Sequence, residues 1–489
     1  MRQRSCVLSA LLLLISLSAV ATEQIRPHCS RGRHPNHAIA QARQSGDASQ
    51  RANEYIGDKR QLVFLVDFTD LAFTDAAPAT LWNKIFNQEN FQETPFRGSV
   101  HDYFYDQSFG QFNLLFDLYY VHMDKAHRQY RSGDIDEFDD TRAGLLLTEI
   151  LDMKKGEITD WSAYDWDNDG YVNQVFILFA GKGQNDGGDE NTIWAHQWKL
   201  SEQSLGPYSR EWGHVYTVTG GGKDYLIDNY AIFPELTGSG TYGTFGTLCH
   251  EYGHCLGLPD FYYGSTSYVG EWDIMDCGNY NEGGYCPPGY SAHEKMYLGW
   301  LTIPELTEAT TITGMGSISN GQKEAYLIRN DGYSDEYYII ENRQQTGWDS
   351  SLPGSGIVVF HVDFDETSWK SGTPNSYAGK RYTIIPANNK LGTSYQSRWA
   401  YPYNGNNVLT NGSSPAASLY HKNTDGTTLM NKPVTEMSVE GGLASFKFMG
   451  GTTGILEKTF VGQSKVLYDL GPVYIIRNAQ GEIKKVIKH

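Results

Sequence analysis

Hydrophobic positions in the first 300 residues follow two spacings, one typical of strands and one typical of helices. Short apolar runs rich in β-branched residues predict buried strands at residues 61–68, 112–123, 174–180 and 225–233. Helical spacing predicts helices at residues 79–86, 100–109 and 137–153. Strands and helices that mix in this way indicate one α/β domain up to Trp300.

Beyond Trp300 the pattern changes to short strand-like runs separated by Gly, Ser and Asn turns. The runs lie at residues 324–328, 337–340, 356–362, 382–386 and 445–449. This spacing is typical of an all-β, sandwich-like domain. Residues 450–454 form a Gly- and Thr-rich linker, and strand-like segments follow at 465–468 and 473–476.

The first 21 residues predict an export signal. Arg2 and Arg4 precede an apolar stretch centred on residues 11–15, and Ala19-Val20-Ala21 is a small-x-small cleavage site. The apolar run is short for a membrane span, and no later run is long enough. Residues 22–58 are polar and without periodicity, which is typical of a leader or short pro-segment. We therefore expect a secreted or cell-surface protein with no integral membrane segment.

Composition and charge limit the number of domains and the kinds of binding partner that we expect. The chain has 489 residues, of which 40% are hydrophobic, so two or three packed domains are expected. The formal net charge of -18 argues against a nucleic-acid partner, which requires a basic surface. The acidic excess is explained by solubility or, alternatively, by calcium binding.

The segment that starts at His250 carries the strongest chemical signal. If residues 244–256 form a helix, His250 and His254 project from one face, so that both imidazoles can bind one ion. Glu251 follows the first histidine, where its carboxylate can reach a metal-bound water and act as general base. This pattern predicts a zinc site.

The third ligand is expected just after this helix. Gly257 permits a sharp turn, Pro259 prevents the helix from resuming, and Asp260 is brought back toward the ion. Two histidines and one carboxylate leave a tetrahedral zinc with its fourth position for water. The alternative is that Asp260 is a loop carboxylate and that Glu294, or another residue, is the third ligand. Glu294 also has a structural explanation, because Ser291 three positions earlier makes a capping box.

A second candidate metal site lies at residues 165–173, which match the first nine positions of an EF-hand-type calcium loop. Its oxygen ligands are expected from Asp165, Asp167, Asp169, the Tyr171 carbonyl and Asn173. Position twelve is Phe176 instead of glutamate, so an isolated structural loop is expected. A solvated turn without metal is the alternative interpretation.

Met275, fifteen residues beyond Asp260, lies in Trp-Asp-Ile-Met-Asp and resembles the Met-turn of the metzincin clan. With the zinc segment, this resemblance extends to the immune inhibitor A-like family of secreted bacterial metalloproteases. Segments similar to that family lie at 64–68, 108–110, 193–196, 287–300, 341–344 and 360–363. The resemblance covers roughly residues 60–365. It implies zinc ligands His250, His254 and Asp260, the base Glu251, and Met275 beneath the site.

The sequence patterns and the resemblance together predict an α+β protein with five parts. These are a signal peptide (1–21), a leader or short pro-segment (22–58), a metzincin-like catalytic domain (59–302), a β-rich sandwich-like domain (303–449), and a linker with a C-terminal tail (450–489). The tail is similar to the sorting tails of some Gram-negative secreted proteins, with a terminal hairpin as the alternative.

The expected function is a secreted zinc endopeptidase acting on extracellular or host proteins. The first alternative is a catalytically lapsed, calcium-stabilised binding or adhesion protein on a protease fold, and the second is a non-proteolytic zinc hydrolase. The intact Glu251 argues against a lapsed enzyme, which has no chemical need for the base. The resemblance to the Met-turn argues against a non-proteolytic zinc hydrolase. Cleavage specificity and oligomeric state are not predicted.

The resemblance also has departures. Some metzincins place a tyrosine that steadies the transition state two positions after the methionine, where this chain has Cys277. Tyr280 and Tyr290 are the candidate substitutes. His196 and His361 are interpreted as structural histidines.

Cleavage after residue 21 leaves five cysteines, and an odd number implies at least one thiol outside a disulfide. Cys277 and Cys286 are close enough in sequence to form a small disulfide loop. Cys255 is expected to be a packed thiol. Cys29 is either incidental or a thiolate that caps the zinc before activation.

Overall fold

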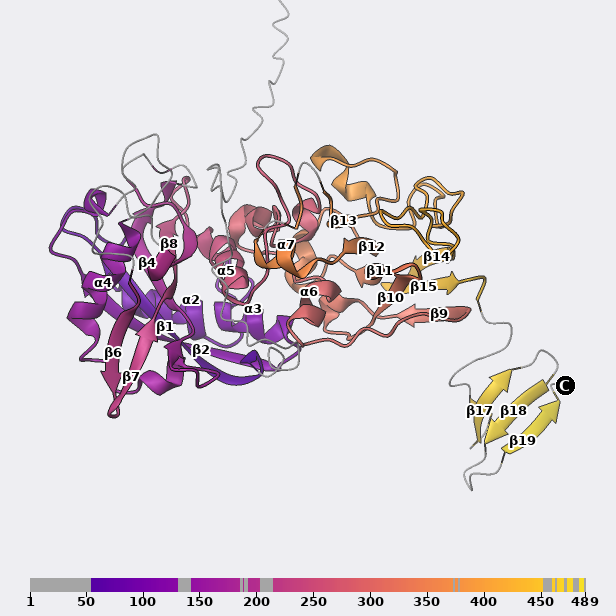
Figure 1. Ribbon diagram of the computed structural model, residues 1–489, viewed down its shortest axis with the longest axis horizontal. Coiled ribbons are helices and arrows are strands. Elements are labelled where there is room, and N and C mark those ends of the chain that lie inside the picture. The colour runs from indigo at the N-terminus through magenta and orange to yellow at the C-terminus, as the bar shows by residue number, and fades with distance from the viewer. Residues whose placement is uncertain are drawn as a thin grey trace, which may run out of the picture.

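The computed structural model describes residues 54–130, 142–184, 188, 192–202, 214–372, 374–376 and 379–451, together with the backbone of four short strands beyond residue 459. The expected signal peptide, most of the leader and Cys29 lie outside these residues. The described chain mixes helices with sheets (Figure 1), which confirms the α+β class.

A five-stranded sheet forms the framework of the N-terminal half. Its order is β2 (Phe112–His122), β1 (Gly57–Asp67), β4 (Val175–Lys182), β8 (Asn229–Leu236) and β5 (His196–Lys199). The first four strands are parallel and β5 is antiparallel to β8. Val63 and Leu65 of β1 face one hydrophobic core, whereas Leu62, Phe64 and Val66 face another. Both faces of the sheet are therefore buried, as parallel sheets require.

Helices cover the two faces. The helices α2 (Pro78–Asn87), α3 (Val100–Gln107) and α5 (Thr244–Cys255) contribute to the first core, and α4 (Ala143–Lys154) contributes to the second. The predicted helices at 79–86 and 100–109 are confirmed. The predicted helix at 137–153 is confirmed from Ala143 onward, and its residues 137–141 lie outside the described part.

The single strand predicted at 225–233 is wrong. The chain forms β7 (Lys223–Ile227) and then β8, which belong to different sheets. β7 pairs with β6 (Tyr216–Gly220) and β3 (Tyr171–Val172). Asp228 separates the two strands, and its carboxylate accepts hydrogen bonds from the backbone N–H and hydroxyl of Ser201. The run at 225–233 is therefore divided at Asp228 between two sheets.

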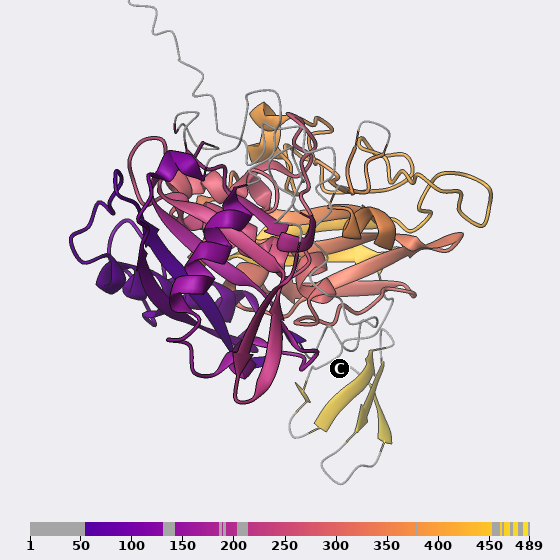
Figure 2. The same cartoon turned by 60° about the vertical axis from the view of Figure 1, so that its left-hand side comes forward.

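The second half of the chain consists mainly of antiparallel sheets and lies beside the first half (Figure 2). One sheet has the order β10 (Ala325–Asn330), β11 (Tyr333–Arg343), β12 (Gly356–Asp363) and β13 (Tyr382–Ile384). The other has the order β14 (Val434–Glu440), β15 (Leu443–Phe448) and β9 (Thr310–Met315). Side chains of both sheets share one hydrophobic core. The predicted strand runs are confirmed, and β9 and β14 are additional.

Two short helices and a terminal sheet complete the described chain. The helices are α6 (Ala292–Tyr297) and α7 (Glu366–Lys370). The terminal sheet has the order β16 (Phe460–Val461), β17 (Ser464–Asp469), β18 (Val473–Arg477) and β19 (Ile483–Ile487). No helix among the described residues is long and apolar enough to cross a membrane.

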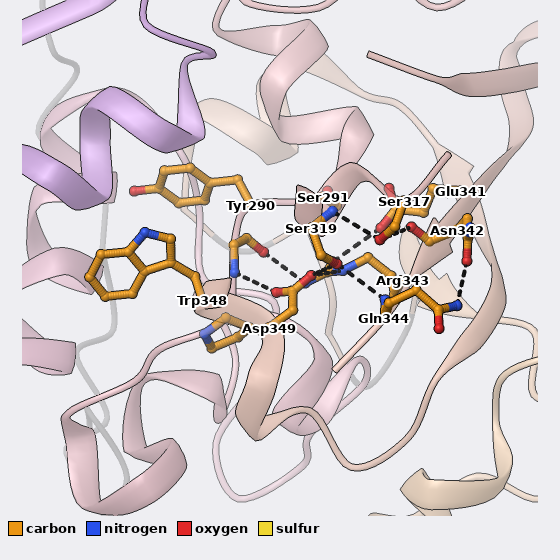
Figure 3. A network of polar contacts seen from close by, with 12 residues as sticks. Tyr290, Ser291, Ser317, Ser319, Glu341, Asn342, Arg343, Gln344, Trp348 and Asp349 are labelled. Carbon is orange, nitrogen blue, oxygen red and sulfur yellow. Dashed lines mark hydrogen bonds and ion pairs between the residues drawn. The ribbon is translucent and has the colours of Figure 1, made fainter. Parts of the chain in front are cut away.

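A buried ion network joins the β-rich half to the segment that leads into α6 (Figure 3). Arg343, with a fully buried side chain, donates to both carboxylate oxygens of Asp349 at 2.7 Å and to Glu341 at 3.0 Å. Arg343 also donates to the carbonyl of Gly289, whose N–H donates to Asp349. The backbone N–H of Ala292 donates to Glu341. The β-rich half therefore holds the chain on both sides of Tyr290.

Candidate metal centre

The helix α5 presents the two predicted histidines. Its inner side carries Tyr252, whose ring lies 4.7 Å from Phe104 and 4.8 Å from Phe176, centroid to centroid. The Tyr252 hydroxyl donates to Gln61 of β1. Aromatic packing and this hydrogen bond fix the rotation of the helix about its axis. The predicted helix at 244–256 is confirmed, and His250 and His254 lie one turn apart on it.

The histidine tautomers follow from two backbone contacts. The Nδ1 atom of His250 lies 2.7 Å from the carbonyl oxygen of Ile274, and that of His254 lies 2.8 Å from the carbonyl oxygen of Leu258. A carbonyl oxygen can only accept, so each Nδ1 carries the proton. Each neutral imidazole then presents a lone pair at Nε2, which is the state that binds a metal.

Asp260 completes the group. Its Oδ1 atom lies 3.2 Å from Nε2 of His250 and 3.3 Å from Nε2 of His254. The three atoms lie within 4.8 Å of one another and all three residues can act as metal ligands. Two imidazole lone pairs and a carboxylate oxygen are all acceptors, so their convergence fits a cation.

The turn after α5 brings Asp260 into place. Gly257 has a φ of +90°, which an L-residue rarely adopts, and the N–H of Leu258 returns to the carbonyl of Gly253. The N–H of Phe261 then donates to the carbonyl of Met275 at 2.9 Å. The predicted sharp turn at Gly257 is confirmed.

Met275 is fully buried next to the helix. A Cβ atom added at Gly253 would lie only 2.6 Å from the Met275 Sδ atom. The short segment at 274–275 thus contacts His250 through Ile274, α5 through the methionine sulfur, and the Asp260 loop through the Met275 carbonyl. The turn at 274–275 therefore supports both His250 and the loop that carries Asp260. Contacts of this kind orient the ligands in metal sites.

Burial and the charges of neighbouring side chains together shift the pKa values of the residues in the site. Burial raises the pKa of Asp260, but the two histidines outweigh it and hold that pKa well below its usual range. Burial also lowers the pKa of His254, and Asp260 outweighs that effect and raises it. Glu251 is 4% exposed, and burial raises the pKa of its carboxyl. The neighbouring histidines partly offset that rise.

The structure brings Asp260, and not Glu294, to the histidines. Glu294 makes the predicted capping box at the start of α6, where its Oε2 accepts from the N–H of Ser291 at 2.6 Å. Burial raises the pKa of Glu294 to about 7. This carboxyl therefore has a structural role at the helix start.

The sequence profile of the immune inhibitor A peptidase M6 catalytic domain matches residues 49–300, just over half of the chain. This chain belongs to the peptidase M6 family. The match contains α5, the Asp260 loop and Met275.

Two known proteins are similar to parts of this chain. It is 27% identical to immune inhibitor A of Bacillus thuringiensis subsp. alesti over 320 residues, which cover 55% of this chain and 44% of that protein. It is 31% identical to the pre-pro-metalloprotease PrtV of Vibrio cholerae serotype O1 (strain M66-2) over 142 residues, 27% of this chain and 14% of that protein. The matches thus span less than half the length of either relative.

The disulfide loop that the spacing of Cys277 and Cys286 would allow is not formed, because neither thiol takes part in a disulfide. The Cys277 thiol lies 3.1 Å from Asp276, and the buried Cys286 thiol lies 3.3 Å from the carbonyl of Trp348. The two thiols therefore contact different partners. Cys255 is a buried thiol, as expected.

The structure shows the contacts and the burial of the other histidines and tyrosines named in the sequence analysis. His196 contacts the Trp194 carbonyl and the Tyr230 hydroxyl, and His361 contacts Glu336, so both are structural. Tyr290 is fully buried and its hydroxyl lies 3.5 Å from the Cys249 carbonyl. Of the two candidate tyrosines, Tyr280 is the one that is partly exposed.

The predicted calcium loop brings together three carboxylates. Oxygens of Asp165, Asp167 and Asp169 lie within 4.8 Å of one another. The side-chain oxygen of Asn173 accepts a hydrogen bond from the N–H of Trp166 at 2.6 Å. Tyr171 begins β3 directly after the loop.

The Asn173 amide also donates to Glu54, at 2.9 Å. Sequence reasoning missed Glu54, because it lies in the polar segment before β1 and no motif or periodicity connects it to the loop.

The ligand assignment predicts different effects for two carboxyl residues. We expect Asp260→Asn to weaken zinc binding by at least about 100-fold, because even second-shell changes cost up to about that much. We expect Glu294→Gln to retain one zinc per folded chain. Metal analysis after dialysis against a zinc buffer measures both. The assignment is wrong if Asp260→Asn keeps zinc and Glu294→Gln loses it while folded.

Proposed function

We propose that this chain is a zinc-dependent endopeptidase whose metal ligands are His250, His254 and Asp260. The observation that carries the proposal is the convergence of two imidazole Nε2 atoms and one carboxylate oxygen beside the buried Glu251. The donor set, two nitrogens and one oxygen, is the composition of catalytic zinc sites that keep a position open. Membership of the M6 family supports the same assignment.

In this proposal the chain's own groups prepare the metal site and move protons. Zinc, when bound, supplies Lewis-acid chemistry that activates water and polarises the peptide carbonyl. Ile274 and Leu258 hold the two imidazoles in the tautomer that binds metal. Glu251 accepts the proton that the attacking water loses and delivers it to the leaving amine. Burial favours this role, because it raises the pKa of the Glu251 carboxyl and so makes the carboxylate a stronger base.

We further propose that Met275 forms the Met-turn of a metzincin-like catalytic domain, followed by a sandwich-like β domain. Tyr280 is our candidate for steadying the oxyanion, because it is partly exposed whereas Tyr290 is buried. The export signal at 1–21 and the tail beyond residue 450 support action outside the cell, on extracellular or host proteins.

The direct test is hydrolysis of casein, and of an internally quenched peptide with both ends blocked, by the chain that lacks residues 1–21. We expect cleavage of both substrates, loss of activity after metal removal with a chelator, and recovery with one equivalent of zinc. A blocked peptide excludes an exopeptidase. Activity that survives complete removal of zinc would contradict the proposal.

We also propose that the loop at Asp165–Asp169 binds a structural calcium ion. Hard cations take carboxylate oxygens, and the three aspartates gather theirs in one place. Asp165 is 3% exposed, and its Oδ1 is buried with no hydrogen-bond partner among the described residues. The Nζ atom of Lys223 lies 3.5 Å from the other carboxylate oxygen of Asp165.

A further inference from the structure

One carboxylate oxygen of Glu54 is buried without a hydrogen-bond donor among the described residues. The residue is 5% exposed, and its Oε1 accepts from Asn173. Its Oε2 is buried and has no hydrogen-bond partner among the residues that the structure describes. A buried carboxylate oxygen without a donor is costly, so such an atom points to a ligand or a proton.

Glu54 shares a small cavity with the acidic loop. The cavity has a volume of about 10 Å³, and Glu54, Asp167 and Asp169 line it together with Trp166 and Asn173. This is the space of about one water-sized sphere. A single small ion therefore suits its size better than an organic ligand does.

The charge of the cavity is strongly negative. Two further carboxyl groups, those of Asp167 and Asp169, line it together with Glu54. The Nζ atom of Lys59 lies 3.5 Å from the carbonyl oxygen of Trp166. Like charges that share a small buried space repel one another, and a shared cation would relieve that repulsion.

We propose that Glu54 is a further ligand of the calcium ion held by the loop at Asp165–Asp169. It would provide the carboxylate that EF-hand loops carry at position twelve, which in this chain is the buried Phe176. The inference rests on the proposed calcium loop and adds a ligand that is distant in sequence.

The bound ion would join the starts of two neighbouring strands. Glu54 precedes β1, the loop precedes β4, and β1 pairs with β4 from Leu62 and Val175 onward. Tyr55 is already anchored, because its carbonyl accepts from the indole of Trp300 at 2.9 Å. Calcium would add a second anchor and would place the end of any removable leader before Glu54.

The test uses the zinc-loaded chain that lacks residues 1–21, freed of calcium and titrated with calcium chloride in a calorimeter. We compare the wild type with Glu54→Gln, Asp167→Asn and, as a control for charge, Glu157→Gln, which is exposed on the surface. Glutamine matches glutamate in size, and zinc content with circular dichroism verifies that each variant is folded. The melting temperature with and without calcium gives a second readout.

We expect wild type and Glu157→Gln to bind one calcium ion that Asp167→Asn does not bind. We expect Glu54→Gln to bind it at least about 10-fold more weakly and to gain less in melting temperature from calcium. Equal affinity of Glu54→Gln and wild type overturns the role of Glu54 and leaves the loop as the calcium site. Absence of a site sensitive to Asp167→Asn overturns the loop, and the Glu54 proposal with it.

Discussion

Glu251→Gln is expected to bind zinc as the wild type does and to hydrolyse casein about 100- to 10,000-fold more slowly, the range that a general base contributes. The amide has the shape of the carboxylate but cannot take the proton of the attacking water. Because Glu251 is not one of the three converging ligands, its replacement should leave the metal in place. Initial rates at matched zinc content measure the effect.

The matched control for this variant is Glu157→Gln, an exposed glutamate paired with Lys154 at 2.8 Å. It should keep wild-type activity. The loss in Glu251→Gln should appear in kcat and kcat/KM together, because the proton transfer occurs only in the transition state. If Glu251→Gln loses zinc in parallel with activity, or keeps activity within a few-fold, Glu251 is not the general base.

Arg343→Met is expected to destabilise the protein by about 3–5 kcal/mol, the usual effect of removing one partner from a buried ion pair. The substitution leaves Asp349 and Glu341 buried with no cation between them (Figure 3). The same guanidinium donates a hydrogen bond to the carbonyl of Gly289. Its loss should also make the backbone next to Tyr290 less ordered. Chemical unfolding followed by tryptophan fluorescence measures the change.

Arg97→Met is the control for this prediction. Arg97 pairs with Glu282 at 3.1 Å, but both side chains are largely exposed, so its loss should change the unfolding free energy by at most about 1 kcal/mol. Similar effects of the two substitutions would show that the Arg343 network does not hold the two halves together.

The local parts of the candidate metal centre could be predicted from the sequence. His250 and His254 converge because a helix places positions four apart on one face. Asp260 follows because Gly257 can adopt a positive φ and turn the chain back. The buried strands β1 and β4 were equally predictable, because their apolar runs reflect burial on both faces.

Features that depend on distant contacts could not be predicted in this way. The sequence spacing of Cys277 and Cys286 permits a disulfide, but tertiary packing directs the Cys286 thiol toward Trp348. The run at 225–233 has the composition of one strand, and only the pairing of β7 with β6 and of β8 with β4 divides it. Glu54 reaches Asn173 only because β1 and β4 are neighbours in the sheet.

The measurement that tests the central claim most directly is zinc K-edge X-ray absorption of the purified chain that lacks residues 1–21. We expect about one zinc per chain, a first shell of nitrogen and oxygen at about 2.0–2.2 Å, and outer-shell scattering from two imidazoles. Asp260→Asn should lower the zinc content. Glu251→Gln should show the same kinds of first-shell atoms around zinc as the wild type. A sulfur ligand at about 2.3 Å, or folded protein without stoichiometric zinc, would contradict a centre made by His250, His254 and Asp260.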